Sequence, residues 1–309
     1  MAVVFAGAGS LRRSICGFVS GAVCGLAAVA YAQLAPTPGI QSNSAALFDK
    51  HAALRSTLAN NPFGRPLVIE SIETNNRITG DAYAVLDSPF AQASSIFPDP
   101  GRMCELITLH LNTKYCRPAV ESGVKLLKVN FGKKTAQELG DTYPLDFVMQ
   151  VPTASKDLLE VVLDAKQGPL GTSNYRIAVE AVPLPGAKTF LHLRYSYGYS
   201  VAGRIAMRGY LATAGSRKVG FTRISQDGGT AYIGGMRGAI ERNTMRYYLA
   251  IDAYLATLQL PAEQRMTARL NHWFDATERY SEQLGEVDKV SYITMKKAEY
   301  ARQQGEAAR

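Results

Sequence analysis

The chain has 309 residues, of which 34 are lysine or arginine and 26 are aspartate or glutamate, and 47% are hydrophobic. This length suits one large domain, or one domain with an appendage. The basic residues are scattered rather than clustered, which argues against a nucleic-acid groove and fits solubility or a mild preference for anionic surfaces. No stretch after residue 32 approaches the ~18 apolar residues that a membrane-spanning helix needs.

The N-terminal segment has the pattern of a targeting signal. Two arginines precede a short apolar run at residues 14–28, and Ala30 and Ala32 supply small side chains at the cleavage-recognition positions. We therefore expect a signal peptide at 1–32 and a periplasmic or secreted mature protein. The alternatives are an uncleaved anchor and a lipoprotein modified at Cys24.

The cysteines agree with export. Cys16 and Cys24 lie within the signal peptide, so the mature chain keeps Cys104 and Cys116. An even pair in an exported chain is most simply a disulfide, and two buried thiols are the alternative. A metal site would need more ligands than these two cysteines, which have only His110 between them. We expect no metal.

The mature chain begins with a lead and a short helix, at residues 33–66. Pro, Gly and Ser are frequent in 33–44, and 45–58 has the pattern of a short amphipathic helix. Two strands are then predicted, at 67–72 and 77–86, with a turn at two asparagines between them.

Two short helices are predicted next. Ser88 can cap the first, with Pro89 at its first position and Phe97 near its end. The prolines of 98–100 stop this helix and start a second one, which we expect to reach His110.

From residue 124 onward the chain alternates between apolar and polar side chains, which predicts an antiparallel meander. The strands are expected at 124–131, 143–151, 158–165, 175–182, 190–200, 204–213 and 217–224. The clearest is 190–200, where one face carries Leu191, Leu193, Tyr195, Tyr197 and Tyr199.

A long helix follows at 234–260, between Gly234 and Pro261. Its apolar stripe has a helical period and contains Ile240, Thr244, Tyr247, Tyr248, Ile251, Tyr254, Leu255 and Leu258. A stripe this broad needs a broad apolar surface to cover, and the predicted strands supply one. The remainder, 261–309, is predicted as a helical extension, with helices at 261–284 and 289–304.

This order of elements resembles the START-like superfamily, which includes Bet v 1-like and polyketide-cyclase-like proteins. The resemblance is carried by ITGDAYAVLDSPFAQASSIFPDPGRMCEL, by the aromatic strand LHLRYSYGYS and by the helix GGMRGAIERNTMRYYLAIDAYL, and it covers 67–260. It implies an α+β helix-grip fold, with a curved antiparallel sheet wrapped around the long helix and an apolar cavity between the two. The residues it would place at that cavity are Tyr195, Tyr197, Tyr199, Tyr247, Ile251 and Tyr254.

Signatures of catalysis are weak. Residues 198–202 nearly match a nucleophile elbow around Ser200, but the last glycine is missing and the segment reads as a strand. His110, His192 and His272 are far apart in the sequence, and each is more often a structural residue than a catalyst. We therefore predict no catalytic residue and no cofactor.

Charge at the start of the long helix has two interpretations. Glu241, Arg242 and Asn243 lie on a helix that otherwise packs inward. Glu241 could pair with Arg237, four residues earlier, or with Arg204 or Arg208 on the sheet. The alternative is a polar contact to a ligand.

The function that this pattern favours is binding of a lipid or another hydrophobic small molecule by an exported protein, with a transient membrane contact and without nucleic acid. Six tyrosines on the aromatic strand and the long helix could form a filled core or line a cavity, and a dry core more typically uses Leu, Ile and Val. The alternative functions are an enzyme, such as a cyclase or hydrolase, acting on a hydrophobic substrate, and an envelope assembly or interaction protein with a closed core.

Overall fold

The structure is a computed structural model that describes residues 44–212, 218–226 and 229–307. The expected signal peptide at 1–32 and nearly all of the expected lead lie outside these residues. Within them, no helix combines the length and the apolar character that crossing a membrane requires.

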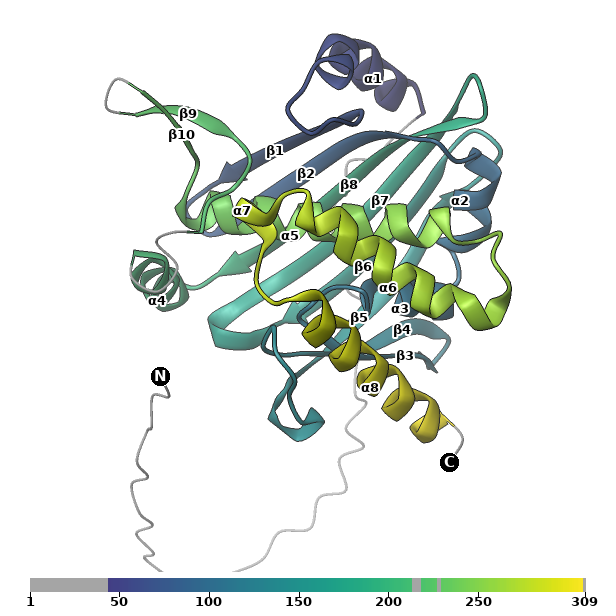
Figure 1. Cartoon of the computed structure of the whole chain (residues 1–309), viewed down its shortest axis with the longest axis vertical. Coiled ribbons are helices and arrows are strands. Elements are labelled where there is room, and N and C mark those ends of the chain that lie inside the picture. The colour runs from purple at the N-terminus through teal and green to yellow at the C-terminus, as the bar shows by residue number, and fades with distance from the viewer. Residues whose placement is uncertain (1–43, 213–217, 227–228, 308–309) are drawn as a thin grey trace, which may run out of the picture. The chain divides into compact units, whose positions relative to one another are not determined.

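One sheet of eight antiparallel strands forms the framework, in the order β1-β2-β8-β7-β6-β5-β4-β3 (Figure 1). Its strands are β1 (Leu67–Glu73), β2 (Arg77–Leu86), β3 (Thr113–Glu121), β4 (Val124–Phe131), β5 (Tyr143–Ala154), β6 (Leu159–Gln167), β7 (Thr172–Leu184) and β8 (Lys188–Tyr199). Most of the predicted strands are present, but β3 was not expected.

Eight α-helices lie within the described residues: α1 (Ser44–Ala59), α2 (Phe90–Ile96), α3 (Pro100–Ile107), α4 (Val201–Ala212), α5 (Gly235–Ala256), α6 (Ala262–Glu278), α7 (Ser281–Leu284) and α8 (Lys289–Ala307). Short 3₁₀ turns at Leu139–Asp141 and Pro169–Gly171 complete the connections. The helix pair α2 and α3 follows β2, and α5 follows the meander. This is the helix-grip order, so the predicted α+β class is confirmed.

The long helix α5 crosses in front of the sheet (Figure 1) and packs on β1, β2 and β8. At Gly80 of β2, an added Cβ would collide with the side chain of Thr244 and lie 3.1 Å from the Cγ1 of Ile240. Glycine therefore permits the close approach of helix and strand. Ile251, in the middle of the stripe, is 1% exposed.

The opposite face of the sheet is covered by α1. Leu47 and Leu58 of this helix join Tyr83, Val182 and Phe190 of the strands in a second, smaller apolar cluster. Because side chains alternate along a strand, Tyr83 and Phe190 lie on this face and the neighbouring residues lie on the α5 face.

A disulfide joins α3 to the edge strand β3. The bond links Cys104 to Cys116, with the two Cα atoms 5.2 Å apart. The expected bridge is therefore present, and it ties the helix pair to the strand that sequence analysis missed.

The C-terminal helices pack on both α5 and the edge of the sheet. Trp273 of α6 donates its indole N–H to the carbonyl of Arg246 in α5 at 3.0 Å, and its ring stacks on Tyr292 of α8 at 4.9 Å. Tyr292 in turn donates to the carbonyl of Leu109 at 2.9 Å.

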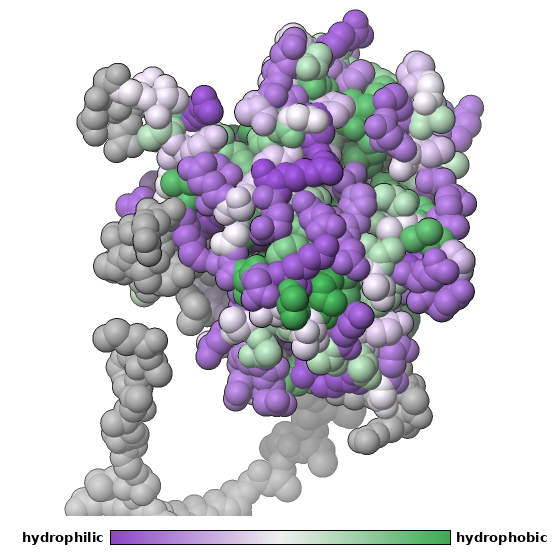
Figure 2. Space-filling model, viewed as in Figure 1, coloured by the Kyte–Doolittle hydropathy of each residue, from purple (hydrophilic) through white to green (hydrophobic). Residues whose placement is uncertain are grey.

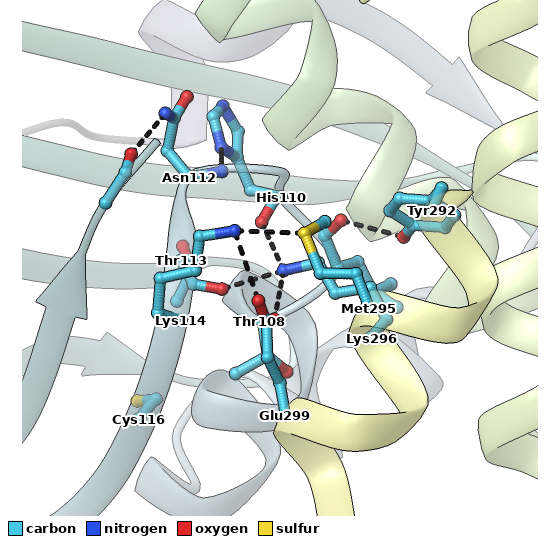
Figure 3. A network of polar contacts seen from close by, with 12 residues as sticks. Thr108, His110, Asn112, Thr113, Lys114, Cys116, Tyr292, Met295, Lys296 and Glu299 are labelled. Carbon is cyan, nitrogen blue, oxygen red and sulfur yellow. Dashed lines mark hydrogen bonds and ion pairs between the residues drawn. The ribbon is translucent and has the colours of Figure 1, made fainter. Parts of the chain in front are cut away.

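Two buried lysines fix α8 on β3 (Figure 3). Lys296 of α8 donates to the carbonyls of His110 and Thr113 at 2.8 and 2.7 Å and pairs with Glu299 at 2.9 Å. Lys114 of β3 also reaches Glu299, at 3.1 Å. Burial lowers the pKa of Lys296 to about 8. Carbonyl dipoles and one shared carboxylate thus compensate the two lysine charges.

Two predicted strands after β8 are wrong. Residues 204–213 belong mostly to α4, whose first turn begins where Ser200 Oγ accepts the Gly203 N–H at 3.0 Å. Ser200 therefore serves as a helix cap. This cap indicates a helix, although the alternating pattern of the segment suggested a strand. Of 217–224, only the end is in a strand, because β9 (Arg223–Gln226) pairs with β10 (Gly229–Tyr232) in a separate hairpin.

The capping expected at Ser88 is also wrong. Pro89 occupies the N-cap position of α2, and no side chain caps it. The carbonyl of Ser88 instead accepts a hydrogen bond from Thr189 at 2.7 Å. The second helix does have a side-chain cap, since Asp99 accepts the N–H of Arg102 at 2.8 Å.

Candidate ligand-binding site

Five tyrosines meet between the sheet and α5. The ring of Tyr195 on β8 lies 5.3 Å from that of Tyr247 on α5 and 5.8 Å from that of Tyr197. Tyr197 stacks on Tyr175 of β7 at 5.2 Å and meets Tyr199 edge-on at 6.5 Å. We call these five residues the tyrosine cluster.

The hydroxyls of the cluster differ in their partners. Tyr199 donates to the carbonyl of Thr74 at 2.7 Å. The side chains of Tyr195, Tyr197 and Tyr247 are largely buried, and the structure shows no hydrogen bond from their hydroxyls within the described ranges. These three oxygens are not among the fully enclosed polar atoms that lack a partner, so each keeps some accessible surface. Burial raises the pKa of each, so all three remain neutral donors at ordinary pH. A tyrosine hydroxyl in such surroundings normally finds a partner, and these three are accessible to water or to a bound molecule.

His110 extends the cluster toward the C-terminal helices. Its ring stacks on Tyr247 at 4.7 Å, and its Nδ1 accepts the backbone N–H of Asn112 at 3.1 Å. Burial lowers its pKa, and the charges of Arg246 and Lys296 lower it further, so the ring is neutral. With Nδ1 accepting, the proton lies on Nε2, and this buried donor has no partner in the described part of the chain.

Two of the predicted ligand-binding residues lie apart from this group. Ile251 is buried one turn beyond Tyr247 on α5. Tyr254 donates to Glu105 of α3 at 2.8 Å, and the guanidinium of Arg269 lies 3.7 Å from its ring centre. Burial and Glu105 raise the pKa of Tyr254 to about 12. Tyr254 therefore links helices and is not in contact with the cluster.

Sequence reasoning did not single out Tyr175 or assign His110 to the site. Tyr175 has the same parity along β7 as Ile177 and Val179, which are both buried, so strand alternation was a usable signal for it. His110 lies in the turn after α3, where no periodicity indicates a direction.

Glu241 is a structural anchor, and its expected partners are wrong. Its carboxylate accepts from Ser71 Oγ at 2.6 Å, from the Phe221 N–H at 2.6 Å and from Thr222 Oγ1 at 2.7 Å. Arg237 donates to Ser71 at 3.0 Å instead of pairing with Glu241. The carboxylate thus holds the segment before β9 against β1 and α5.

The two arginines proposed as alternative partners of Glu241 belong to α4. Arg208 pairs with Glu73 of β1 at 2.9 Å, and Arg204 donates to the carbonyl of Asn75 at 3.1 Å. Both contacts hold α4 against the hairpin of β1 and β2.

A second polar group lies on the α1 face of the sheet, away from the tyrosine cluster. His192 is held between two carboxylates, with Nδ1 2.6 Å from Glu180 and Nε2 2.7 Å from Asp81. Burial would lower its pKa, but the two carboxylates raise it. Tyr83 stacks on the imidazole at 4.4 Å. Since alternation places His192 on the face opposite Tyr195, this group is not beside the candidate site.

Two clefts lie at opposite ends of α5. One, of about 450 Å³, is bordered by Glu73, Arg208 and Met236 at the start of the helix. The other, of about 230 Å³, is bordered by Asp252 in the second half of α5 and by Arg65 in the segment before β1. Among the described residues, no group of three or more His, Cys, Asp or Glu side chains could hold a metal ion.

No protein-family model matches the chain, and no curated protein sequence matches it either. Solved structures do match. A point mutant of norcoclaurine synthase from Thalictrum flavum, in complex with a transition-state analogue, is 14% identical with a TM-score of 0.33, over 48% of this chain and 89% of that chain. Human StAR-related lipid transfer protein 5 is 10% identical with a TM-score of 0.31, over 77% and 95%.

An aromatase/cyclase from a Streptomyces species is 12% identical with a TM-score of 0.33, over 68% of this chain and 99% of that chain. The START-like resemblance is confirmed for the fold by the topology itself, namely the strand order, the helix pair after β2 and the crossing helix α5. At these identities and TM-scores, the matches do not show what this chain binds.

Proposed function

We propose that this protein binds a lipid or another hydrophobic small molecule between the large sheet and α5. The observation that carries the proposal is the tyrosine cluster, in which three hydroxyls make no hydrogen bond among the described residues and keep accessible surface. A closed core would rather use aliphatic side chains, which carry no hydroxyl that needs a partner. An amphipathic ligand would cover the rings of the cluster with its apolar part.

We further propose that binding takes place after export, in the periplasm or outside the cell. The pattern at 1–32 supports a signal peptide, and the bridge between Cys104 and Cys116 is of a kind that persists in oxidising compartments. A transient membrane contact is supported by α4, where Val201 and Ile205 are 68% and 67% exposed. Export and a transient membrane contact are both expected of a carrier that collects its ligand at a bacterial envelope.

The test is to purify the protein from the periplasm and examine it by native mass spectrometry, then extract it with solvent and analyse the lipids. A bound apolar molecule is the expected result. Tyr197→Trp should weaken binding of a fluorescent sterol or fatty-acid probe with little loss of stability, because a cavity accepts the larger ring. A packed core would lose about 1–3 kcal/mol on the same change. The proposal would be refuted if the protein carries no bound lipid, binds no probe and is strongly destabilised by Tyr197→Trp.

A second candidate, an envelope assembly or interaction protein, is favoured by one observation. Apolar side chains reach the surface over the region of α6 and α8 (Figure 2). On α8, Val290 is 76% exposed and Tyr300 is 43% exposed. Exposed apolar groups of this kind mark contact surfaces when they are contiguous. Val290→Ser would abolish a partner complex if this second function holds, and would leave lipid binding unchanged.

A further inference from the structure

Three cations from distant parts of the chain converge on one carboxylate. Glu286, in the linker between α7 and α8, pairs through one oxygen with Lys134 of the β4–β5 connection and through the other with Lys218, before β9. Arg246 of α5 approaches the first of these oxygens at 3.3 Å. The side chains of Glu286 and Arg246 are 7% and 1% exposed. We call these four residues the cationic pocket.

The charges in this pocket do not balance. In the described ranges, none of the three cations pairs with any carboxylate other than that of Glu286, which leaves an excess of positive charge. Burial, together with the charge of Arg242 one turn earlier, lowers the pKa of Arg246 to about 10, although Glu286 opposes this. Burial and the charge of Arg246 likewise lower the pKa of Lys134 to about 7. Lys134 and Lys218 are 29% and 32% exposed, so solvent screens part of this excess, whereas Arg246 is enclosed and also donates to the Leu284 carbonyl at 3.2 Å. The remaining excess favours additional negative charge at this group.

The cationic pocket borders the tyrosine cluster. Arg246 and Tyr247 are consecutive in α5, and Tyr247 stacks on His110. His110 is close enough to Arg246 and Lys134 for their charges to lower its pKa. Two buried donors without partners among the described residues lie in this region, namely His110 Nε2 and Arg246 Nε. Aromatic surface and free donors therefore adjoin the cations.

We propose that the cationic pocket binds the carboxylate head of an amphipathic ligand, and that Glu286 occupies the head-group position when no ligand is bound. This rests on the proposed function and specifies its ligand as a long-chain carboxylic acid, whose tail would lie along Tyr247 and Tyr195. Replacement of one carboxylate by another keeps the local charge constant. Glu286 is held by ion pairs within a short linker, residues 285–288, that has no regular structure, so it can be displaced without unfolding a helix.

The experiment compares binding of anthroyloxystearic acid with binding of its methyl ester to the full-length mature protein. Wild type should bind the acid more tightly than the ester. Lys134→Met should weaken acid binding about tenfold, because a charge-assisted contact contributes about 1.5 kcal/mol or more, and should leave ester binding unchanged. Glu286→Gln should tighten acid binding, because the competing carboxylate is gone.

The matched control is Lys289→Met, which removes a lysine paired with Asp275 at 2.6 Å outside the pocket. This variant should bind both probes as wild type does. If Glu286→Gln fails to fold, Lys134→Met still tests the pocket, since Glu286 keeps Lys218 and Arg246.

The outcomes separate this proposal from the proposed function. If wild type binds neither probe, the proposed function fails. If acid and ester bind equally well and Lys134→Met affects neither, the protein is a hydrophobic carrier and the head-group site is refuted. Tighter binding of stearyl phosphate than of the acid would overturn the assignment of a carboxylate.

Discussion

Removing single hydroxyls from the tyrosine cluster tests whether the cluster is a closed core with satisfied hydrogen bonds or a ligand-binding surface. Tyr197 and Tyr199 are each 6% exposed and lie two residues apart on the same face of β8. Their hydroxyls differ, because Tyr199 donates to the carbonyl of Thr74 and Tyr197 has no partner among the described residues. Tyr197→Phe and Tyr199→Phe are therefore chemically identical changes with different expected costs.

The magnitudes follow from the hydrogen bonds. Tyr199→Phe loses a net contribution of about 0.5–1.5 kcal/mol, toward the lower end because Thr74 is exposed and water can reach its carbonyl. Tyr197→Phe removes a hydroxyl that makes no hydrogen bond in the described fold, so the unliganded protein should be unchanged or stabilised by up to about 1 kcal/mol. The two variants should therefore differ by about 0.5–1.5 kcal/mol.

The assay is urea denaturation of protein from which bound lipid has been extracted, followed by the same measurement with a long-chain alcohol present. In the presence of the alcohol, Tyr197→Phe should gain less stability than wild type, because the ligand hydroxyl loses its partner. Equal destabilisation by the two substitutions in the unliganded protein would show that the Tyr197 hydroxyl is satisfied in the fold. The cluster would then be a closed core, and the reasoning would be refuted.

Two other changes test the packing of α5 and the charges of the cationic pocket. Gly80→Ala should destabilise the protein by about 1–3 kcal/mol, because the new Cβ meets the side chain of Thr244. Adding Thr244→Ala to the same chain should restore part of this stability. An unchanged denaturation midpoint for Gly80→Ala would contradict the close approach of helix and strand. Burial would raise the pKa of Glu286, but hydrogen bonds from Lys134 and Lys218 outweigh it and lower the pKa to about 2. This carboxylate therefore stabilises the fold above pH 4.5, its ordinary pKa, and the contribution is lost as the pH falls toward 2. Between these pH values, the free energy of unfolding should fall less for Glu286→Gln than for wild type. If the free energies of both proteins fall in parallel with pH, the ion pairs of Glu286 do not contribute to stability.

The sheet and the crossing helix could be predicted because their patterns are local. Alternation along β8 and the apolar stripe of α5 each specify one buried face, and the tertiary structure uses both. The START-like resemblance placed Tyr195 and Tyr247 on facing surfaces, and their rings are in contact. The end of the stripe was less informative, because Tyr254 has the same period but contacts Glu105 and Arg269 instead.

The missed elements have physical causes. In β3, Arg117, Pro118 and Glu121 interrupt the apolar pattern, and the strand is buried mainly in its first half. The segment that forms α4 contains apolar residues at every second position, such as Ile205 and Met207, which mimic a strand. The cap at Ser200 decides in favour of the helix, and capping depends on one hydroxyl rather than on a period.

The polar end of the candidate site could not be predicted from the sequence, because its four members come from four separate segments. Lys134, Lys218, Arg246 and Glu286 share no spacing, and only the fold brings them together. Their assembly also changes the role of the C-terminal extension. The sheet and α5 supply the aromatic surface, whereas the extension supplies the one carboxylate that pairs with the three cations. A ligand that takes the place of Glu286 must release the linker at 285–288, so ligand binding and the packing of the extension are coupled through this one side chain.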